Sequence, residues 1–331
     1  MVTCAIVGAT GLVGSTFLKV LEEKKLDIDE YYLFASKKSS GKKITFMDKE
    51  YIVEELTEEV TTRNFDYALF SAGSEISKQF APLFSKHATI VIDNSSYFRM
   101  DESVPLVVPE INIGTAYNSS IIANPNCSTI QATVALKPLL DNYGIKRVII
   151  STYQAVSGAG ILGIKDLENT SKGLPPQKFT AKIYNNCIPH IDTFEENLYT
   201  KEEMKMINEI KKILDDYTID ITATAVRVPV LNCHSESINI QLDKEFEIED
   251  IKQLLAKSPG IAVLDDPSRN IYPLATFVDG KDDVFIGRIR RDYSIPNGLN
   301  IWVVSDNVRK GAASNAVQIL EKLIEKRHGI V

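Results

Sequence analysis

Three regularly spaced glycines near the N-terminus restrict the fold of this chain more than any other feature. The apolar segment 4–7 leads into Gly8, Gly11 and Gly14, and residues 15–23 then carry apolar side chains at helical spacing. A strand, a glycine turn and a helix in this order are typical of the first βαβ unit of a dinucleotide-binding domain, although the spacing is GxxGxxG rather than GxGxxG. We expect cofactor contacts along the whole turn, at Gly8, Thr10, Gly11, Leu12, Val13 and Gly14.

Strand and helix patterns continue to alternate after this unit. Apolar segments at 67–71 and 89–93 flank a helical pattern at 75–87. Repeated βαβ order predicts an α/β fold with a doubly wound parallel sheet. Such sheets bind ligands at the carboxyl ends of their strands, so Ser71 and Gly73, which follow the strand at 67–71, are further candidate cofactor contacts. Small polar turns are also ordinary loop chemistry.

The second predicted strand, 31–35, indicates which dinucleotide is bound. It ends at Ser36, Lys38 and Ser39 rather than at an acidic residue that would hold a ribose 2′-hydroxyl. Hydroxyl groups and a cation suit a 2′-phosphate, so these three residues favour NADP over NAD. A solvated lysine loop is the alternative interpretation.

One cysteine lies where thiols become nucleophiles. Cys127 follows a predicted strand at 121–123 and the turn Asn124-Pro125-Asn126, and it precedes a predicted helix at 130–140. Unpaired N–H groups and the positive end of a helix dipole favour a thiolate at such a position. A small buried cysteine with no chemical role is the alternative.

Length and charge restrict the remaining possibilities. A chain of 331 residues with 44% hydrophobic content suggests two domains. We expect a nucleotide domain at 1–126, completed by a C-terminal helix at 308–331, and a catalytic domain at 127–307. The net charge of -7, with acidic and basic residues mixed along the chain, predicts neither nucleic-acid nor membrane partners. Four cysteines without framework spacing and no signal-peptide pattern favour the cytoplasm.

The second domain shows a different pattern. A long strand is expected at 147–156, followed by a glycine turn containing Ser157, Gly158 and Gly160. A charged helix at 202–216 precedes strands at 222–230 and 237–242. We expect an α+β domain with a mixed, partly antiparallel sheet and helices on one face. The amphipathic segment 308–326 should pack back on the nucleotide domain.

Four motifs in order are similar to those of one enzyme family. They are GATGLVG from residue 8, NPNCST from 124, QAVSGAG from 154 and RVPVLNCH from 227, and SDNVRKGA from 305 extends the match. The chain resembles aspartate-semialdehyde dehydrogenase of the bacterial type. The resemblance implies reversible, NADPH-dependent reduction of aspartyl phosphate to aspartate semialdehyde and phosphate, on the route to lysine, methionine and threonine, by a homodimer.

The resemblance also implies roles for individual residues. Cys127 would attack the acyl phosphate, His234 would act as general acid and base, and Gln154 would orient the acyl intermediate or a water. Arg227 would bind the substrate carboxylate, for which its planar fork is suited. The expected phosphate ligands are Arg99, Asn126 and Lys205.

Two further positions, Glu202 and Asn307, have more than one possible role. Glu202 matches the acidic residue that meets the substrate amino group, but Glu203 is adjacent, and a helical ion pair between Glu202 and Lys205 is also plausible from spacing alone. Asn307 matches a nucleotide contact, while a helix N-cap is its plain structural role. We place the turn at Ser157, Gly158 and Gly160 with the cofactor.

Other functions fit the pattern less well. N-acetyl-glutamyl-phosphate reductase and glyceraldehyde-phosphate dehydrogenase also use a catalytic cysteine, but the sequence around that cysteine differs from NPNCST. A nucleotide sensor would not need a cysteine, glutamine, arginine and histidine in this order. Cys187, His190, Cys233 and His234 lack the spacing of tetrahedral zinc ligands, so we expect no metal.

Overall fold

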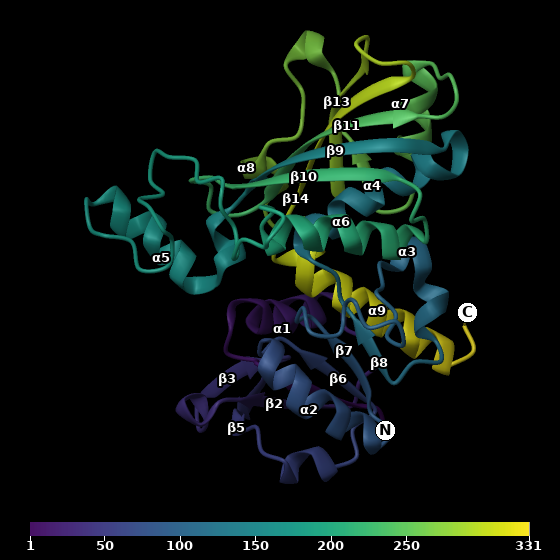
Figure 1. Ribbon diagram of the computed structural model, residues 1–331. Coiled ribbons are helices and arrows are strands. Elements are labelled where there is room, and N and C mark those ends of the chain that lie inside the picture. The colour runs from purple at the N-terminus through teal and green to yellow at the C-terminus, as the bar shows by residue number, and fades with distance from the viewer. Residues whose placement is uncertain (331) are drawn as a thin grey trace. The chain divides into compact units, whose positions relative to one another are not determined.

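The computed structural model describes residues 1–330, which divide into two compact units (Figure 1). The first unit comprises residues 1–125 and the segment from Ala312 onward, and the second comprises Asn126–Gly311. Among helices within residues 1–330, none combines the length and apolar character that crossing a bilayer requires.

The first unit contains a six-stranded, wholly parallel sheet. Its strand order is β5-β2-β1-β6-β7-β8. The bounds are β1 (Thr3–Val7), β2 (Glu30–Ala35), β5 (Glu54–Glu55), β6 (Tyr67–Phe70), β7 (Ile90–Asp93) and β8 (Ile121–Ala123), and β3 (Lys43–Phe46) and β4 (Lys49–Ile52) form a separate hairpin. Strand β2 lies on one side of β1, and the chain later crosses to the other side of β1 to form β6. This reversal creates the switch point at which doubly wound sheets bind ligands.

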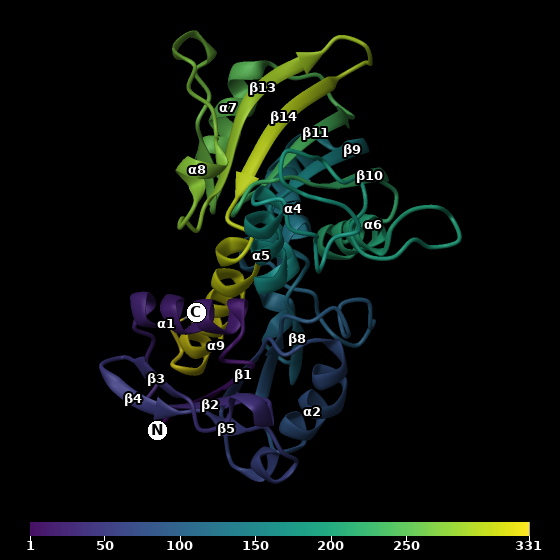
Figure 2. The ribbon, with the colours of Figure 1, turned by 90° about the vertical axis from the view of Figure 1, so that its left-hand side faces the viewer.

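Helices cover both faces of this sheet. Helix α1 (Leu12–Lys24) packs beside α9 (Ser314–Arg327), while α2 (Ser74–Lys86) packs on β6 and β7 (Figures 1 and 2). Right-handed crossovers require the two faces, because β1 to β2 and β6 to β7 run in opposite directions across the sheet. The core joins Phe17 of α1, Leu33 of β2 and Leu320 of α9. The predicted doubly wound fold is confirmed, and the C-terminal helix packs in this unit. A short helix, α3 (Pro109–Asn112), completes it.

The second unit contains a mixed sheet in the order β10-β9-β11-β14-β13-β12. The outer pairs β10–β9 and β12–β13 are parallel and the inner pairs are antiparallel. The bounds are β9 (Ile145–Gln154), β10 (Asp220–Arg227), β11 (His234–Leu242), β12 (Ile261–Val263), β13 (Val284–Asp292) and β14 (Gly298–Ser305). The expected mixed sheet is confirmed.

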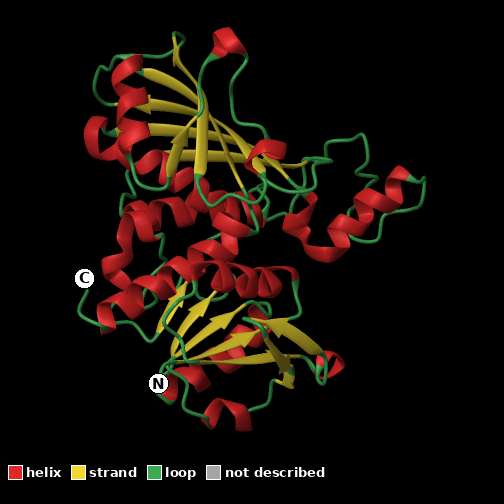
Figure 3. Cartoon of the chain, turned by 180° about the vertical axis from the view of Figure 1, so that it is seen from behind, coloured by secondary structure: helices red, strands yellow, loops and turns green. Residues whose placement is uncertain are grey.

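Three helices line one face of the mixed sheet. Helix α4 (Cys127–Tyr143) contacts β9, β11, β13 and β14, with α6 (Lys201–Leu214) and α7 (Ile248–Lys257) on either side of it. Helix α5 (Gly160–Ser171) stands away from the sheet on its own small apolar cluster (Figure 3). Helix α8 (Ala275–Val278) contacts β14. The face covered by α4 carries Gln154 and His234, so the sheet and α4 together position the candidate catalytic groups.

The boundaries between the two units differ from the expected ones at both places where the chain passes from one unit to the other. Asn126 belongs to the second unit because it is the N-cap of α4, to which Cys127 also belongs. Residues 308–311 belong there too, since the π-helical turn Arg309–Ala313 brings Gly311 against Cys127. The segment predicted at 308–326 is helical from Arg309, where a π-helical turn, Arg309–Ala313, runs directly into α9 at Ser314.

Candidate active site

Cys127 is the first residue of α4, and its helix is capped by the residue before it. The Asn126 side-chain oxygen accepts hydrogen bonds from the N–H groups of Ser128, at 2.9 Å, and Thr129, at 3.4 Å. The first turn of α4 carries no acidic side chain. The positive end of the helix dipole favours a negative charge at the Cys127 sulfur, and the carboxylates of Glu202 and Glu209, which accept hydrogen bonds from Asn126, reduce this effect.

Gly311 packs directly against Cys127. A Cβ atom at Gly311 would lie 2.9 Å from the Cys127 Cβ, closer than real Cβ contacts. The glycine lies in the π-helical turn Arg309–Ala313, a distortion that often marks functional sites. Any larger residue at position 311 would displace Cys127.

His234 is fully buried at the start of β11 and has one defined tautomer when neutral. Its Nδ1 accepts a hydrogen bond from the Ala155 N–H at 3.0 Å, so the proton is on Nε2. Nε2 has no hydrogen-bond partner among residues 1–330. Burial and the charge of Arg227 lower the pKa of His234 well below its usual range, and the Cys233 carbonyl opposes this more weakly. Neutral His234 can therefore donate a hydrogen bond from Nε2 to a bound ligand.

Arg227 and His234 converge over Gly158. A Cβ atom at Gly158 would lie 2.8 Å from Arg227 Nη1 and 3.0 Å from His234 Cε1. Arg227 is 4% exposed and donates from Nη1 to the Ala155 carbonyl at 2.6 Å. Burial lowers the pKa of Arg227, while the charges of Glu202 and Cys127 raise it. A guanidinium stays charged in proteins, so this buried cation is suited to an anionic ligand.

The side-chain amides of Asn126 and Gln154 both donate to one carboxylate near Cys127. Glu202 Oε1 accepts from Asn126 Nδ2 at 3.0 Å and from Gln154 Nε2 at 3.3 Å. Gln154 Nε2 also donates to the Ser128 hydroxyl at 2.8 Å. Lys205 Nζ lies 3.5 Å from Glu202 Oε2 and 2.7 Å from a carboxylate oxygen of Asp192. Helix α6 therefore brings both an anion and a cation to the first turn of α4.

In the first unit, the glycine turn has the geometry of a phosphate cradle. Gly8 has a φ of 88°, and a Cβ on Gly14 would lie 2.0 Å from the Gly8 carbonyl oxygen, so both positions require glycine. The N-cap of α1 is Gly11, which makes no side-chain cap bond, so the helix N–H groups can meet a pyrophosphate. The Thr10 and Ser39 hydroxyls lie 3.4 Å apart, which joins this turn to the loop at Ser36 and Lys38.

Comparison with protein families decides where this arrangement belongs. Residues 3–118 match the model described as semialdehyde dehydrogenase, NAD binding domain, and residues 136–310 match semialdehyde dehydrogenase, dimerisation domain. The aspartate-semialdehyde dehydrogenase of Aquifex aeolicus is 53% identical over 332 residues, covering 97% of this chain and 98% of that protein. This chain belongs to the aspartate-semialdehyde dehydrogenase family. It is therefore an oxidoreductase of amino-acid biosynthesis.

Other members of the family agree in sequence and in structure. The Bacillus subtilis aspartate-semialdehyde dehydrogenase is 48% identical, covering 96% of each chain. The crystal structure of aspartate semialdehyde dehydrogenase II complexed with ASA from Vibrio cholerae superposes with a TM-score of 0.93 at 44% identity, covering 98% of each chain. The Candida albicans enzyme with NADP gives 0.77 at 26% identity, covering 100% of each chain.

The structure gathers most of the predicted catalytic and substrate residues of the family in the second unit. Cys127, Gln154, Arg227 and His234 surround the first turn of α4 and Gly158, together with Asn126, Glu202 and Lys205. Arg99 lies in the first unit, where it donates to the main-chain carbonyls of Asn124 and Asn94 at 2.9 and 3.0 Å.

The choice between Glu202 and Glu203 has a geometric answer. Glu203 completes the capping box of α6 with Thr200 and accepts the Ala225 N–H at 2.9 Å. Glu202 instead points to Asn126 and Gln154. Of these two glutamates, Glu202 is therefore the one oriented toward the first turn of α4.

Several predicted cofactor contacts have other partners in the second unit. Asn307 Oδ1 accepts the Cys233 N–H at 2.9 Å, and its amide donates to the Ser157 hydroxyl at 3.0 Å. Cys233 has a φ of 71°, which is uncommon for a non-glycine residue. Asn307 thus holds the turn that delivers His234. Gly160 has a φ of 74° with open space around its Cα, and Gly73 is similar in the first unit.

The sequence patterns did not single out four residues that shape this site. They are Phe179, whose ring lies 5.8 Å from the Arg227 guanidinium carbon, Asp192, Glu209 and Gly311. Glu209 is seven residues after Glu202, so helical spacing alone places both on one face of α6. Nothing local in the sequence indicates Phe179, which comes from a long irregular segment.

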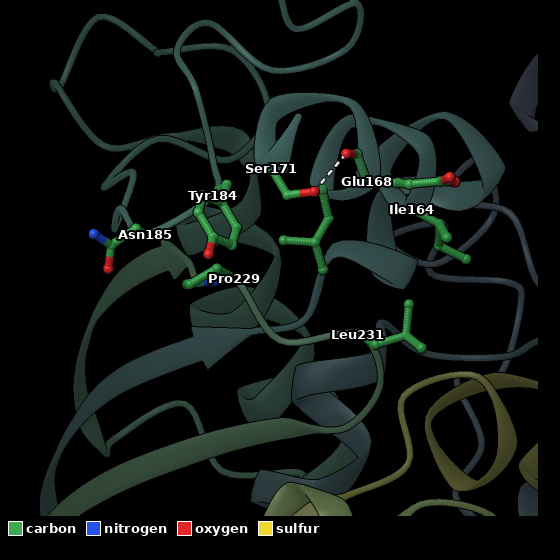
Figure 4. A pocket seen from close by; sticks show the side chains of 8 residues that line it. Ile164, Glu168, Ser171, Tyr184, Asn185, Pro229 and Leu231 are labelled. Carbon is green, nitrogen blue, oxygen red and sulfur yellow. Dashed lines mark hydrogen bonds between the residues drawn. The ribbon is translucent and has the colours of Figure 1, made fainter. Parts of the chain in front are cut away.

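The pocket drawn in Figure 4 is separate from this chemistry. It has a volume of about 570 Å³ and is lined by side chains of α5 together with Tyr184, Asn185, Pro229 and Leu231. None of the residues that line it is a cysteine or a histidine. Ile164 and Leu167 on its wall belong to the same small apolar cluster as Phe179. We do not assign substrate to it.

A cluster of Cys233, Asp279 and Asp306 has ligand atoms within 4.8 Å of one another. Both carboxylates of the cluster already accept hydrogen bonds. Asp306 accepts from the main-chain N–H groups of Gly280, Val308 and Arg309, and Asp279 accepts from the side-chain amide of Asn232. These bonds explain the cluster without an ion.

Proposed function

We propose that this chain catalyses the reversible, NADPH-dependent conversion of L-aspartyl 4-phosphate to L-aspartate 4-semialdehyde and phosphate, through a thioacyl group on Cys127. The observation that carries the proposal is the convergence of a helix-terminal thiol, a buried imidazole donor and a buried guanidinium in one unit. Family membership supports the substrate class. The product would enter lysine, methionine and threonine synthesis in the cytoplasm.

In the first step, the Cys127 thiolate attacks the acyl carbon of the acyl phosphate. A carbon–sulfur bond forms, and the bond between the acyl carbon and the phosphate oxygen breaks with phosphate as leaving group. The helix N-terminus favours the thiolate before attack. Asn126, Lys205 and Arg99 are the proposed phosphate ligands, the first two of which surround the carboxylate of Glu202.

His234 is best suited to donate a hydrogen bond. Its Nε2–H can donate a hydrogen bond that stabilises the negative charge developing on the acyl oxygen at each tetrahedral stage. Bound NADPH would supply the hydride that reduces the thioester to the aldehyde level. Collapse then breaks the carbon–sulfur bond and returns the thiolate of Cys127.

The two charged ends of the aspartyl group have complementary partners. Arg227 is the proposed ligand of the substrate carboxylate, because Nη1 is held by the Ala155 carbonyl while Nε has no partner within residues 1–330. Glu202 is the proposed ligand of the amino group. Gln154 would orient the acyl group, since its own orientation is set by Ser128 and Glu202.

The proposed cofactor is NADP. The hydroxyls of Thr10, Ser36 and Ser39 and the cation of Lys38 suit a 2′-phosphate, and Gly8, Gly11, Leu12, Val13 and Gly14 would hold the pyrophosphate. Ser71, Gly73, Ser157, Gly158, Gly160 and Asn307 remain proposed cofactor contacts. The Candida albicans relative described with NADP supports this choice.

We also propose a homodimer. The sheet face opposite Gln154 carries Tyr153, which is 40% exposed, and Trp302, whose ring centroid lies 5.5 Å from it. A family model described as a dimerisation domain spans this sheet. Light scattering should give twice the chain mass, whereas a single-chain mass at micromolar concentration would refute the dimer.

The activity is tested by following NADPH absorbance after mixing NADP and aspartate semialdehyde, with and without inorganic phosphate. We expect sustained NADPH formation only with phosphate, and none from Cys127→Ser. Folded parent protein that binds NADPH yet forms none under these conditions would contradict the proposal.

A further inference from the structure

The N-terminal cap of α4 is only half built from its own residues. Asn126 caps the N–H groups of Ser128 and Thr129 through its side chain. A complete capping box also needs a carboxylate or amide three residues on, which accepts the N–H of the N-cap residue itself. That position in α4 is Thr129, whose side chain cannot supply one.

Helix α6 shows the complete arrangement. Thr200 Oγ1 accepts the Glu203 N–H at 3.3 Å, and Glu203 Oε2 accepts the Thr200 N–H at 2.7 Å. Both partners lie within one helix turn. The same chain therefore builds one capping box locally and leaves the one beside its candidate nucleophile without the local acid.

The missing acceptor of α4 comes from α6. Glu209 Oε2 accepts the main-chain N–H of Asn126 at 2.7 Å, and Glu209 is 1% exposed. Two turns earlier on the same helix face, Glu202 Oε1 accepts from the Asn126 side chain at 3.0 Å. Helix α6 thus holds Asn126 by its main chain and by its side chain at once.

We propose that Glu209 is a positioning residue that completes the α4 capping box from a neighbouring helix and so fixes the direction in which Cys127 presents its sulfur. The inference rests on the proposed nucleophilic role of Cys127. The Glu209 bond holds the peptide before Asn126, whose φ of -62° and ψ of 146° set the direction of the next Cα–Cβ bond. Small displacements of a nucleophile cost large factors in rate.

The test compares three substitutions of Glu209 in full-length protein carrying Cys187→Ser, which removes the exposed cysteine. Glu209→Asp keeps the negative charge but moves the accepting oxygen away from the Asn126 N–H. Glu209→Gln keeps an accepting oxygen on a side chain of the same length, and Glu209→Ala removes both the charge and the acceptor. Glu203→Ala is the matched control, because Glu203 is another buried carboxylate of α6 that accepts main-chain N–H groups. The readouts are the iodoacetamide alkylation rate of Cys127 across pH, kcat, and KM for NADP.

We expect Glu209→Asp and Glu209→Ala to lower both the alkylation rate and kcat by about tenfold or more, with KM for NADP unchanged, and Glu209→Gln to stay within about threefold of the parent. Glu203→Ala should lower thermal stability but leave the alkylation rate per folded molecule unchanged. If Glu209→Ala does not fold, the contrast between Asp and Gln still decides.

Parental alkylation and turnover in Glu209→Asp would overturn the inference, as would an equal loss in Glu203→Ala or in Glu209→Gln. A parent Cys127 that alkylates no faster than an ordinary exposed thiol would instead contradict the proposed function, and the inference would fall with it. The two failures are therefore distinguishable.

Discussion

The Nδ1 atom of His234 accepts a hydrogen bond from the main-chain N–H of Ala155, 3.0 Å away. A main-chain N–H can only donate, so the neutral ring carries its proton on Nε2, the atom beside Gly158. In this tautomer His234 cannot take a proton from Cys127 at Nε2. This tautomer supports the proposal that the N-terminus of α4 favours the thiolate and that His234 donates a hydrogen bond toward the acyl oxygen.

The buried His234 should make stability depend on pH. Its pKa is depressed in the folded state, so as pH falls below about 6.5 the unfolded chain takes up a proton that the folded chain excludes. Stability contributed by neutral His234 is present above that pH and is lost below it. We expect the parent to lose up to about 1.4 kcal/mol per pH unit from this group between pH 6.5 and its folded pKa.

Denaturant unfolding of the parent and of His234→Asn at pH 7.5 and 5.5 measures this effect. Asparagine cannot protonate, so the variant should lose less stability on acidification than the parent. Equal losses in both proteins would show that His234 titrates normally in the folded state.

Gly158 should not tolerate a side chain. A Cβ at this position would lie 2.8 Å from Arg227 Nη1 and 3.0 Å from His234 Cε1. We expect Gly158→Ala to fold but to lower kcat/KM by about 100-fold, because it displaces both groups. Gly114→Ala is the control, since a Cβ there meets nothing within 4 Å. Parental turnover in Gly158→Ala would contradict the described convergence.

Phe179 should influence substrate affinity through Arg227. Its ring lies 5.8 Å from the guanidinium carbon, and Asp166 holds its segment by accepting the N–H groups of Gln177, Lys178 and Phe179 at 2.7 to 2.9 Å. A partly desolvated cation–π contact contributes about 1 to 2 kcal/mol. We expect Phe179→Leu to raise KM for aspartate semialdehyde about five- to thirtyfold, with little change in KM for NADP.

Steady-state kinetics with each substrate varied in turn tests this expectation. Phe277→Leu is a matched control, because the ring of Phe277, on α8, forms a cation–π contact with Lys281. The role of Phe179 is refuted if both variants bind semialdehyde like the parent, or if Phe179→Leu raises both KM values together.

Lys38 should discriminate NADP from NAD. It lies in a solvent-exposed turn beside Ser39, so its contribution to 2′-phosphate binding is about 1 kcal/mol after screening. We expect Lys38→Ala to raise KM for NADP about fivefold and to leave KM for NAD unchanged, with Lys49→Ala like the parent. An equal change for both cofactors would remove the proposed 2′-phosphate contact.

The sequence was sufficient for features that depend on local chemistry. The glycines at 8, 11 and 14 require a turn that only a tight strand-to-helix connection provides, and the structure contains it. Cys127 was expected before a helix, and it is in fact the first residue of α4, three residues earlier than the helical pattern begins. Short-range signals such as a proline turn and an N-cap asparagine carry this information.

Features that depend on distant contacts were missed. Strands β12, β13 and β14 were not predicted, and β13 in particular is rich in charged residues and is interrupted at Arg288, which has a φ of 53°. Glu209 looks like one more charged residue of an amphipathic helix until the Asn126 N–H is seen beside it. Asn126 is expected in the nucleotide domain from the sequence, and in the structure it is grouped with the second unit as the N-cap of α4.

The most direct test of the central claim is to trap the acyl group. The parent enzyme is mixed with aspartate semialdehyde and NADP without phosphate, quenched in acid and digested, and the peptide containing Cys127 is weighed by mass spectrometry. We predict one aspartyl group on Cys127, lost when phosphate is added before the quench and absent from Cys127→Ser. NADPH formation in the parent without any adduct, or an adduct that persists in Cys127→Ser, would contradict thioacyl chemistry at this residue.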